Sequence, residues 1–326
     1  MLVALSGGAD SLALAAAVAF EAPRADLRAG AVVVDHGLQE DSAGVAGRAA
    51  GQARALGLEP VIVARVEVDG GPASRTGGVE AAARSARYRA LVDAARETEA
   101  VAILLGHTLD DQAETVLLGL ARGSGPTSLA GMPAAVSDRG ARFVRPLLGI
   151  RRATTRAFCA DSRLEPWNDP HNEDAAYTRV RVRRSVLPVL ERELGPGVAE
   201  ALTRTAEVLA EDAAALDDMV REVAEDVCEH VEAGVAVSVA ALEANPPALR
   251  NRLIRFVAQS EFGVSLSRTQ TLAVARLVTE WRGQGPLDLP GFTATRREGR
   301  IVLTAAGEPG NREPAHDPLS ARDELS

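Results

Sequence analysis

The chain contains no lysine, and all 36 of its basic residues are arginine. This absence excludes a lysine Schiff base and the lysine of a GxxxxGKS/T phosphate loop. Cysteine is also scarce, because Cys159 and Cys228 are too few and too far apart for a zinc cluster or a disulfide framework. Any phosphate that this chain binds must therefore meet backbone amides, hydroxyl groups, arginine or a metal ion.

Long apolar runs are missing as well. The longest stretch without a polar or charged side chain covers residues 12–20, about half of the roughly 20 residues that a membrane-spanning helix needs. Met1 leads directly into an apolar strand and a glycine loop, without the basic stretch and cleavage pattern of a secretory signal. We therefore expect a cytoplasmic protein with no membrane partner.

Charge is distributed unevenly along the 326 residues, whose net charge of −9 disfavours a generic nucleic-acid binder. Residues 139–192 hold 12 arginines against 6 acidic residues, and residues 250–300 hold 9 arginines against 4. Between them, residues 193–232 hold 12 acidic residues and 2 arginines. The two basic regions suit contact with RNA phosphates, and a solvated surface without a partner is the alternative interpretation.

The first half of the chain alternates short apolar runs with helix-like stretches, the pattern of a parallel sheet covered by helices. We expect strands at residues 2–5, 31–34, 60–66, 101–105 and 143–144, and helices at residues 11–20, 42–56, 79–96, 110–121 and 154–161.

A Gly-Pro-Gly break at residues 195–197 marks a domain boundary. Beyond it, the pattern predicts helices at residues 198–232, 247–260 and 267–282, followed by a hairpin at residues 292–304. We therefore expect an α/β domain over residues 1–194, a mostly helical second domain over residues 195–305, and a disordered tail over residues 306–326.

The hexapeptide Ser-Gly-Gly-Ala-Asp-Ser at residues 6–11 connects the first strand to the first helix. Its glycines let backbone amides curl around an anion, and the positive end of the helix dipole points to the same spot. Asp10 would repel a phosphate unless a divalent cation stood between them, so it points to Mg²⁺. A plain glycine turn with Asp10 and Ser11 as helix caps is the alternative. The expected ATP-phosphate residues are Ser6, Gly7, Gly8, Ala9, Asp10 and Ser11.

Polar side chains also follow the second and fourth expected strands, where open α/β sheets meet their ligands. His36 follows one strand and His107 the other. Asp111 and Glu114, three residues apart at the start of the next helix, suit a metal ion or a general base, although helix-dipole complementarity alone would also explain them.

Two arginines, Arg84 and Arg87, share one face of a predicted helix with an aromatic residue, Tyr88. The charges of these arginines suit either a phosphoryl group during its transfer or the phosphates of a bound RNA. The spacing does not decide which of the two arginines acts on the phosphate.

The hexapeptide resembles the S-G-G-x-D-S signature of the PP-loop ATP pyrophosphatases, whose loop holds the pyrophosphate of ATP. The later motifs Val-Asp-His-Gly-Leu at residues 34–38, Gly-His-Thr-Leu-Asp-Asp-Gln-Ala-Glu-Thr at residues 106–115 and Arg-Pro-Leu-Leu at residues 145–148 extend the likeness. Together they resemble the tRNA(Ile)-lysidine synthetase family to about residue 190, and more weakly to about residue 304. The resemblance implies a Rossmann-like parallel sheet of the adenine nucleotide alpha hydrolase type, followed by a helical tRNA-binding domain.

The activity that this resemblance implies is that of a carbon–nitrogen ligase for tRNA modification. It would use ATP to attach L-lysine to C2 of the wobble cytidine of tRNA(Ile) with a CAU anticodon, through an adenylated cytidine, releasing AMP and diphosphate. The lysine amine, with an ordinary pKa of about 10.4, must lose a proton, and Asp111 is the best candidate acceptor. Whether the chain forms a homodimer stays open.

We expect catalysis from Asp10, Arg84, Arg87 and Asp111; ATP binding by residues 6–11 with His36 and His107; Mg²⁺ binding by Asp10, Asp111 and Glu114; and tRNA binding by Arg122, Arg145, Arg179, Arg183, Arg250 and Arg252.

Two other functions compete with this interpretation. A PP-loop tRNA thiolase needs cysteine pairs and often an iron–sulfur cluster, and Cys159 and Cys228 supply no Cys-x-x-Cys pair. A nucleotide-binding regulatory module without catalysis has little use for carboxylates such as Asp10, Asp111 and Glu114, which argue against it.

Overall fold

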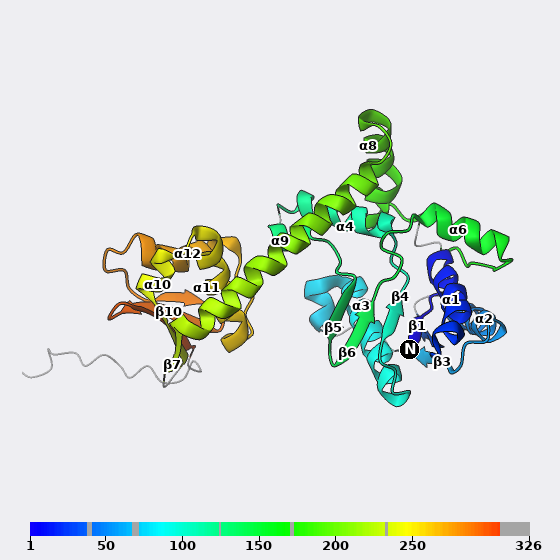
Figure 1. Cartoon of the computed structure of the whole chain (residues 1–326), viewed down its shortest axis with the longest axis horizontal. Helices are drawn as coiled ribbons and strands as arrows, with labels where there is room; N and C mark the ends of the chain where they lie inside the picture. Colours follow the sequence, from blue (N-terminus) through cyan, green and yellow to red (C-terminus); the bar gives the residue numbers. More distant parts are fainter. Residues whose placement is uncertain (38–40, 67–71, 124, 170–172, 232–233, 307–326) are drawn as a thin grey trace, which may run out of the picture. The chain divides into compact units, whose positions relative to one another are not determined.

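The computed structural model describes residues 1–37, 41–66, 72–123, 125–169, 173–231 and 234–306, with only the backbone described for residues 72–81. The chain folds into two compact units, Met1–Ala213 and Ala214–Ser326 (Figure 1). The long helix α9 (Val198–Val227) contributes to both units. The domain boundary expected after residue 194 lies just before this helix and stays a prediction. All but the first residue of the expected tail lies outside the described residues.

The first unit is built on a six-stranded sheet with the order β3-β2-β1-β4-β6-β5. Its strands are β1 (Leu2–Ala4), β2 (Gly30–Asp35), β3 (Val61–Arg65), β4 (Ile103–Leu105), β5 (Ala135–Asp138) and β6 (Ala141–Val144). Neighbouring strands run parallel except β5, which is antiparallel to β6. The expected parallel sheet is confirmed. Strand β5 escaped prediction because all four of its residues are exposed, so it carries no buried apolar face.

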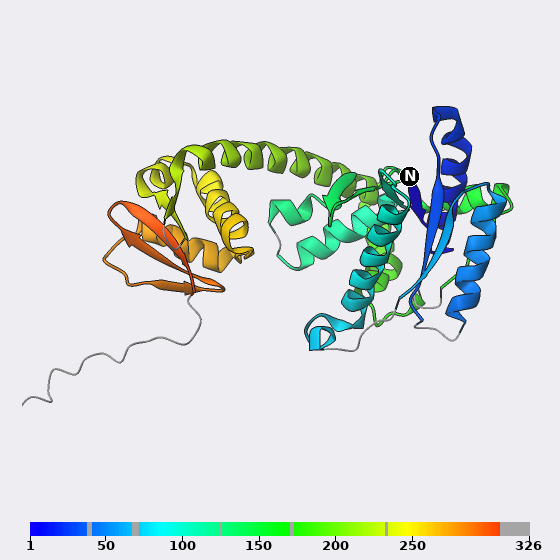
Figure 2. The same cartoon turned by 90° about the horizontal axis from the view of Figure 1, so that it is seen from below.

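Helices cover both faces of this sheet (Figure 2). On one face, Val3 and Leu5 pack with Leu12 of α1, with α2, and with Cys159 of α6. On the other face, Leu2 packs against Leu91 of α3. This alternation follows from the period of two along a strand. The helices of this unit are α1 (Ala9–Glu21), α2 (Ser42–Ala55), α3 (Pro72–Glu97), α4 (Leu109–Ala121), α5 (Pro126–Leu129), α6 (Arg152–Asp161), α7 (Thr178–Arg181) and α8 (Leu187–Leu194), with a 3₁₀ turn η1 (Pro23–Ala25) and a π-helical turn η3 (Val182–Val186).

The strand order reverses at β1, which lies between β2 and β4. In open α/β sheets this switch point forms a crevice at the carboxyl ends of the strands, where ligands bind. The loop after β4 approaches the start of α1 closely there, since a Cβ on Gly106 would lie 3.1 Å from backbone atoms of Asp10 and Ser11. The segments that follow β1 and β4 therefore meet at one place.

The second unit combines helices with an antiparallel sheet of order β7-β8-β11-β10-β9. It contains β7 (Cys228–Val231), β8 (Gly234–Ser238), α10 (Val239–Ala244), α11 (Pro247–Phe262), α12 (Arg268–Thr279), β9 (Leu287–Leu289), β10 (Phe292–Arg297) and β11 (Arg300–Ala305). The expected helices and the hairpin are confirmed. The helix expected to reach residue 232 ends at Val227, because residues 228–231 pair with β8 instead. Sequence periodicity could not reveal that pairing, which depends on a partner strand.

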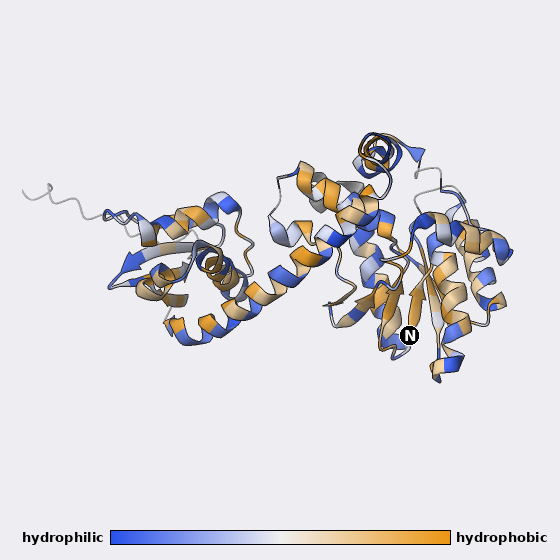
Figure 3. Cartoon of the chain, turned by 45° about the horizontal axis from the view of Figure 1, so that its top comes forward, coloured by the Kyte–Doolittle hydropathy of each residue, from blue (hydrophilic) through white to orange (hydrophobic). Residues whose placement is uncertain are grey.

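Apolar residues concentrate on the strands and the inward helix faces of each unit (Figure 3). In the second unit, Leu253, Phe292 and Ile301 belong to one buried core. Within the described part of the chain, no helix has both the length and the apolar character needed to cross a bilayer.

Candidate active site

The loop between β1 and α1 is held in shape by hydrogen bonds to its own serine hydroxyl groups. Gly7 has φ +83°, and a Cβ there would meet the Cβ of Ala49 at 3.3 Å. The Ser6 amide donates to Ser11 Oγ at 3.2 Å, and Ser11 Oγ donates to the Gly8 carbonyl at 3.0 Å. Gly8 caps α1 without a side-chain hydrogen bond to the first turn. The amides at the positive end of α1 therefore suit a phosphate group.

The carboxylate of Asp10, in the first turn of α1, is held by the first turn of α6. Arg152 Nε lies 3.3 Å from Asp10 Oδ2, and the hydroxyl of Thr155 donates to Asp10 Oδ1. Burial raises the pKa of Asp10, the neighbouring carboxylate of Asp111 raises it too, and the contacts with Thr155 and Arg152 oppose that rise. The pKa of Asp10 therefore lies above its ordinary value, while its side chain keeps 24% of its exposure.

Asp111 belongs to a capping box at the start of α4. Its Oδ2 accepts from the amide of Thr108 at 2.9 Å and from the Thr108 hydroxyl at 2.8 Å. Its Oδ1 accepts from Arg152 Nη2 at 2.7 Å. Burial alone would raise the pKa of Asp111, but Arg152, the Thr108 amide and Arg179 together lower it. Asp111 therefore completes the capping box of Thr108 and is also an ionised carboxylate.

Glu114, one turn further along α4, has no solvent exposure. Its Oε1 accepts from Arg152 Nη1 at 3.1 Å and from Arg183 Nε at 2.7 Å. Its Oε2 accepts from Arg179 Nε at 2.9 Å and from Arg183 Nη2 at 3.0 Å. A buried carboxylate needs such partners, since its desolvation is otherwise too costly. We call the resulting set of three carboxylates and three guanidiniums the charged cluster; its members are Asp10, Asp111, Glu114, Arg152, Arg179 and Arg183.

The three carboxylates expected to bind magnesium therefore surround a guanidinium. Nitrogens of Arg152 lie 3.3 Å from Asp10, 2.7 Å from Asp111 and 3.1 Å from Glu114. Among the residues that the structure describes, no three His, Cys, Asp or Glu side chains form a metal-binding group. A magnesium ion held by all three carboxylates does not fit this arrangement, because the guanidinium already takes their oxygens.

The two expected histidines lie at the carboxyl ends of β2 and β4, where Nδ1 of His36 and Nδ1 of His107 are buried without a hydrogen-bond partner among the described residues. Burial lowers the pKa of His107 to about 4. Burial, helped by Arg87, also lowers the pKa of His36. Both rings are neutral, and each has a ring nitrogen free to hydrogen-bond a polar ligand such as a nucleotide.

The two arginines of α3 approach different histidines. Arg84 Nη2 donates to the Tyr88 hydroxyl at 3.2 Å, and its guanidinium lies 4.9 Å from the centre of that ring. The charge of Arg84 acts on the pKa of His107, whereas the charge of Arg87 acts on the pKa of His36. Both arginines thus stand near the crevice, and neither is singled out for the phosphate.

Most of the arginines expected to bind tRNA use their donors inside the protein. Arg179 and Arg183 belong to the charged cluster. Arg145 is buried and donates to the Pro133 carbonyl at 2.7 Å.

In the second unit, buried Arg252 pairs with Asp217, and Arg250 donates to the Leu242 carbonyl at 3.4 Å. Arg122 is exposed at the end of α4.

Sequence reasoning missed Arg152 and Thr155, which make all the side-chain contacts of Asp10 described above. A usable signal was present: Arg151 and Arg152 stand at the start of α6, where basic side chains oppose the helix dipole and acidic ones are absent. Such a pair indicates that carboxylates from elsewhere in the fold lie opposite. The number of arginines in the sequence does not show which of their side chains point into the protein.

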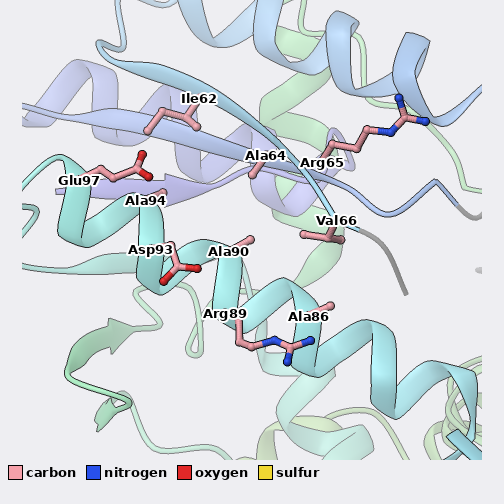
Figure 4. Close-up of a pocket in the computed structure, with 10 residues that line it drawn as sticks. All are labelled: Ile62, Ala64, Arg65, Val66, Ala86, Arg89, Ala90, Asp93, Ala94 and Glu97. Atoms are coloured by element: carbon pink, nitrogen blue, oxygen red, sulfur yellow. The ribbon is translucent and has the colours of Figure 1, made fainter. Parts of the chain in front are cut away.

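A cavity of about 390 Å³ lies elsewhere, between edge strand β3 and helix α3 (Figure 4). Small side chains, among them Ala64, Ala86 and Ala90, leave this space open. None of the expected site residues lines it. It is therefore separate from the crevice that holds the hexapeptide and the charged cluster.

Comparison with known proteins covers both units. The family model described as the PP-loop domain matches residues 1–190, and the model described as the TilS substrate binding domain matches residues 238–302. The chain is 65% identical over 304 residues to a protein named tRNA(Ile)-lysidine synthase from Leifsonia xyli subsp. xyli, covering 93% of this chain and 89% of that protein. Proteins of the same name from Salinispora tropica and Streptomyces coelicolor are 53% and 51% identical over 311 residues, covering 94% and 93% of this chain and 91% and 84% of those proteins.

Proposed function

The chain belongs to the tRNA(Ile)-lysidine synthase family, and we propose that it attaches L-lysine to C2 of the wobble cytidine of tRNA(Ile) with a CAU anticodon. The cytosine O2 would attack the α-phosphate of ATP and release diphosphate. The side-chain amine of lysine would then attack C2, and AMP would leave with the former O2 atom. The first step is needed because the cytosine oxygen is otherwise a poor leaving group.

One observation carries this proposal: Asp10 and Asp111, which come from two different segments of the chain, contact the same guanidinium beside the phosphate loop. The loop amides supply donors for the departing diphosphate. The carboxylates beside the loop supply acceptors for the proton that the lysine ammonium must lose. His36 and His107 offer unused ring nitrogens at the same sheet edge. This combination supports ATP chemistry at the switch point rather than nucleotide binding alone.

Proton removal from the lysine ammonium needs a basic group. Asp111 was the expected acceptor, but its lowered pKa makes it a weak base, and its oxygens are engaged by Thr108 and Arg152. The oxygens of Asp10 also have partners, Arg152 and Thr155, but its pKa is raised and its side chain is 24% exposed, against 12% for Asp111. We therefore assign proton acceptance to Asp10 first and keep Asp111 as the ionised partner of Arg152.

Charge growing on the α-phosphate would be stabilised by Arg84 or Arg87, which stand near His107 and His36 respectively. Mg²⁺ would accompany ATP, as it commonly binds through substrate phosphates and one or two carboxylates. Glu114 is wholly enclosed, and the oxygens of Asp111 are held by Thr108 and Arg152. Since Asp10 is assigned the proton, we place the ion on the phosphates of ATP. The homodimer and the cytoplasmic location stay predictions.

Recognition of tRNA would involve the second unit, which matches a substrate-binding domain. Arg250 and Arg252 hold internal partners there, so we propose a structural part for them and place direct phosphate contact on exposed arginines such as Arg122. Phosphate contacts of this kind weaken with added salt.

Incorporation of labelled lysine into a tRNA(Ile) transcript with a CAU anticodon tests the proposal. The intact protein, with ATP and Mg²⁺, should transfer lysine to this transcript and not to one whose wobble base is uridine. Asp10→Ala should lower the rate by about 1000-fold while the far-ultraviolet spectrum stays unchanged. Label transfer that does not depend on ATP, or no transfer at all by the unaltered protein, would contradict the proposal.

A further inference from the structure

Arg152 is the guanidinium that touches every carboxylate of the charged cluster. Its Nε contacts Asp10 at 3.3 Å, its Nη2 contacts Asp111 at 2.7 Å, and its Nη1 contacts Glu114 at 3.1 Å. Arg183 reaches two of these carboxylates and Arg179 reaches the side chain of one. Within the described residues, Arg152 is the cation paired with Asp10.

The first turn of α6 is fastened to both neighbouring segments. The backbone amide of Arg152 donates to Asp110 Oδ2 at 2.7 Å, which ties α6 to the start of α4. One turn later, the hydroxyl of Thr155 contacts both the Arg152 carbonyl, at 2.9 Å, and the carboxylate of Asp10. The residues at positions 152 and 155 share one helix face because they are three apart. This face therefore contacts the phosphate loop and α4 together.

We propose that Arg152, assisted by Thr155, is a positioning residue that sets the separation between Asp10 on the phosphate loop and Asp111 on α4. This inference rests on the proposed function of the crevice. Arg152 acts through these carboxylates, since each of its three guanidinium nitrogens already has a carboxylate partner. Arginine suits this task because its planar fork presents donors in fixed directions, whereas the ammonium of lysine is a single point charge.

The position of Arg152 in its own helix supports this assignment. It stands at the first residue of α6, where a positive charge opposes the helix dipole. Local helix stability therefore does not account for it. The compensating interactions come from Asp10, Asp111 and Glu114, and they remain strong because the side chain of Arg152 is only 13% exposed.

Arg151 provides a matched control on the same helix. It is also an arginine at the start of α6, and it forms ion pairs with Asp110 at 3.4 Å, Glu191 at 3.9 Å and Glu200 at 3.4 Å. It therefore fastens α6 to its neighbours without touching Asp10 or Asp111. If Arg152 only fastened the helix, the two arginines would be equivalent.

The first test compares the kinetics of lysine transfer. Arg152→Ala should lower kcat about 100-fold and change the KM for ATP less than about threefold, because positioning affects the chemical step more than ground-state binding. Added guanidinium ion at a non-denaturing concentration should restore part of the rate, and Arg152→Lys should retain less than the native rate. Arg151→Ala should stay within about twofold of the native kcat. Equal losses in the two alanine variants, or a native kcat in Arg152→Ala, would overturn the proposal.

A second measurement does not need activity. The change in Tm caused by Asp10→Asn should be more positive in the Arg152→Ala variant than in the native chain. In that variant the Asp10 carboxylate has lost its counter-ion, whereas in the native chain it is paired with Arg152. The same shift in both backgrounds would overturn the pairing. Thr155→Val and the exposed Thr154→Val form a further matched pair, of which only the former should alter the effect of Asp10→Asn. This cycle remains interpretable if the native protein transfers no lysine, so the two proposals fail separately.

Discussion

The two units bury charge in different ways. In the first unit, three carboxylates and three guanidiniums meet where α4, α6 and residues 179–183 approach the phosphate loop. In the second unit, the core around Phe292 and Ile301 is apolar, and the buried Arg252 pairs with Asp217. An apolar core requires the right volumes and periodicity, whereas the charged cluster requires separate segments to bring opposite charges together. The first unit therefore buries charge as a cluster beside the phosphate loop, whereas the core of the second unit around Phe292 and Ile301 is apolar.

Removal of Glu114 should have the largest effect on stability. In Glu114→Ala, the Arg152, Arg179 and Arg183 guanidiniums lose a fully buried partner, which should lower the free energy of unfolding by about 3–5 kcal/mol. Urea denaturation measures this loss. Glu193→Ala, which removes an exposed partner of Arg192, should change the free energy by less than about 0.5 kcal/mol. Similar values for the two variants would show that the charged cluster does not stabilise the fold.

The stability of the first unit should also depend on pH through His107. The folded pKa is about 4 and the ordinary value is 6.5, so between these values the unfolded chain binds more protons. Stability should therefore fall as pH decreases from 6.5 to about 4, by up to about 3 kcal/mol in total from this group. Unfolding of the native chain and of His107→Asn, measured at several pH values, isolates this contribution. Parallel pH profiles for the two proteins would contradict it.

The apolar core of the second unit should give a smaller response. Ile301→Val removes one buried methylene from this core and should lower the free energy of unfolding by about 0.5–1.5 kcal/mol. The kcat for lysine transfer should stay unchanged, because Ile301 belongs to the core of the second unit, whereas the phosphate loop and the charged cluster belong to the first. Val208→Ala, at an exposed position of α9, is the matched control and should have little effect on unfolding. Reduced kcat in Ile301→Val would contradict this contrast between the charged cluster and the apolar core.

The same contrast explains what the sequence could reveal. The strands β1, β2 and β4 were predictable because each is a buried apolar run, and residues 6–11 were recognisable because glycines and a helix start stand side by side. Strand β7 was not predictable, since residues 228–231 leave the helical pattern only by pairing with β8. Arg152 was missed because its role depends on Asp10, 142 residues away in the sequence. The inward orientation of Arg179 and Arg252 was hidden for the same reason.

The identity of the nucleoside at the wobble position tests the central claim most directly. After incubation of tRNA(Ile) with this protein, ATP and lysine, mass spectrometry of the digested tRNA should show a cytidine that has gained one lysine and lost one water. That product should disappear in Asp10→Ala and persist at the native level in Arg151→Ala. An unmodified cytidine in the presence of the native protein, or a modified one in the presence of Asp10→Ala, would contradict the account.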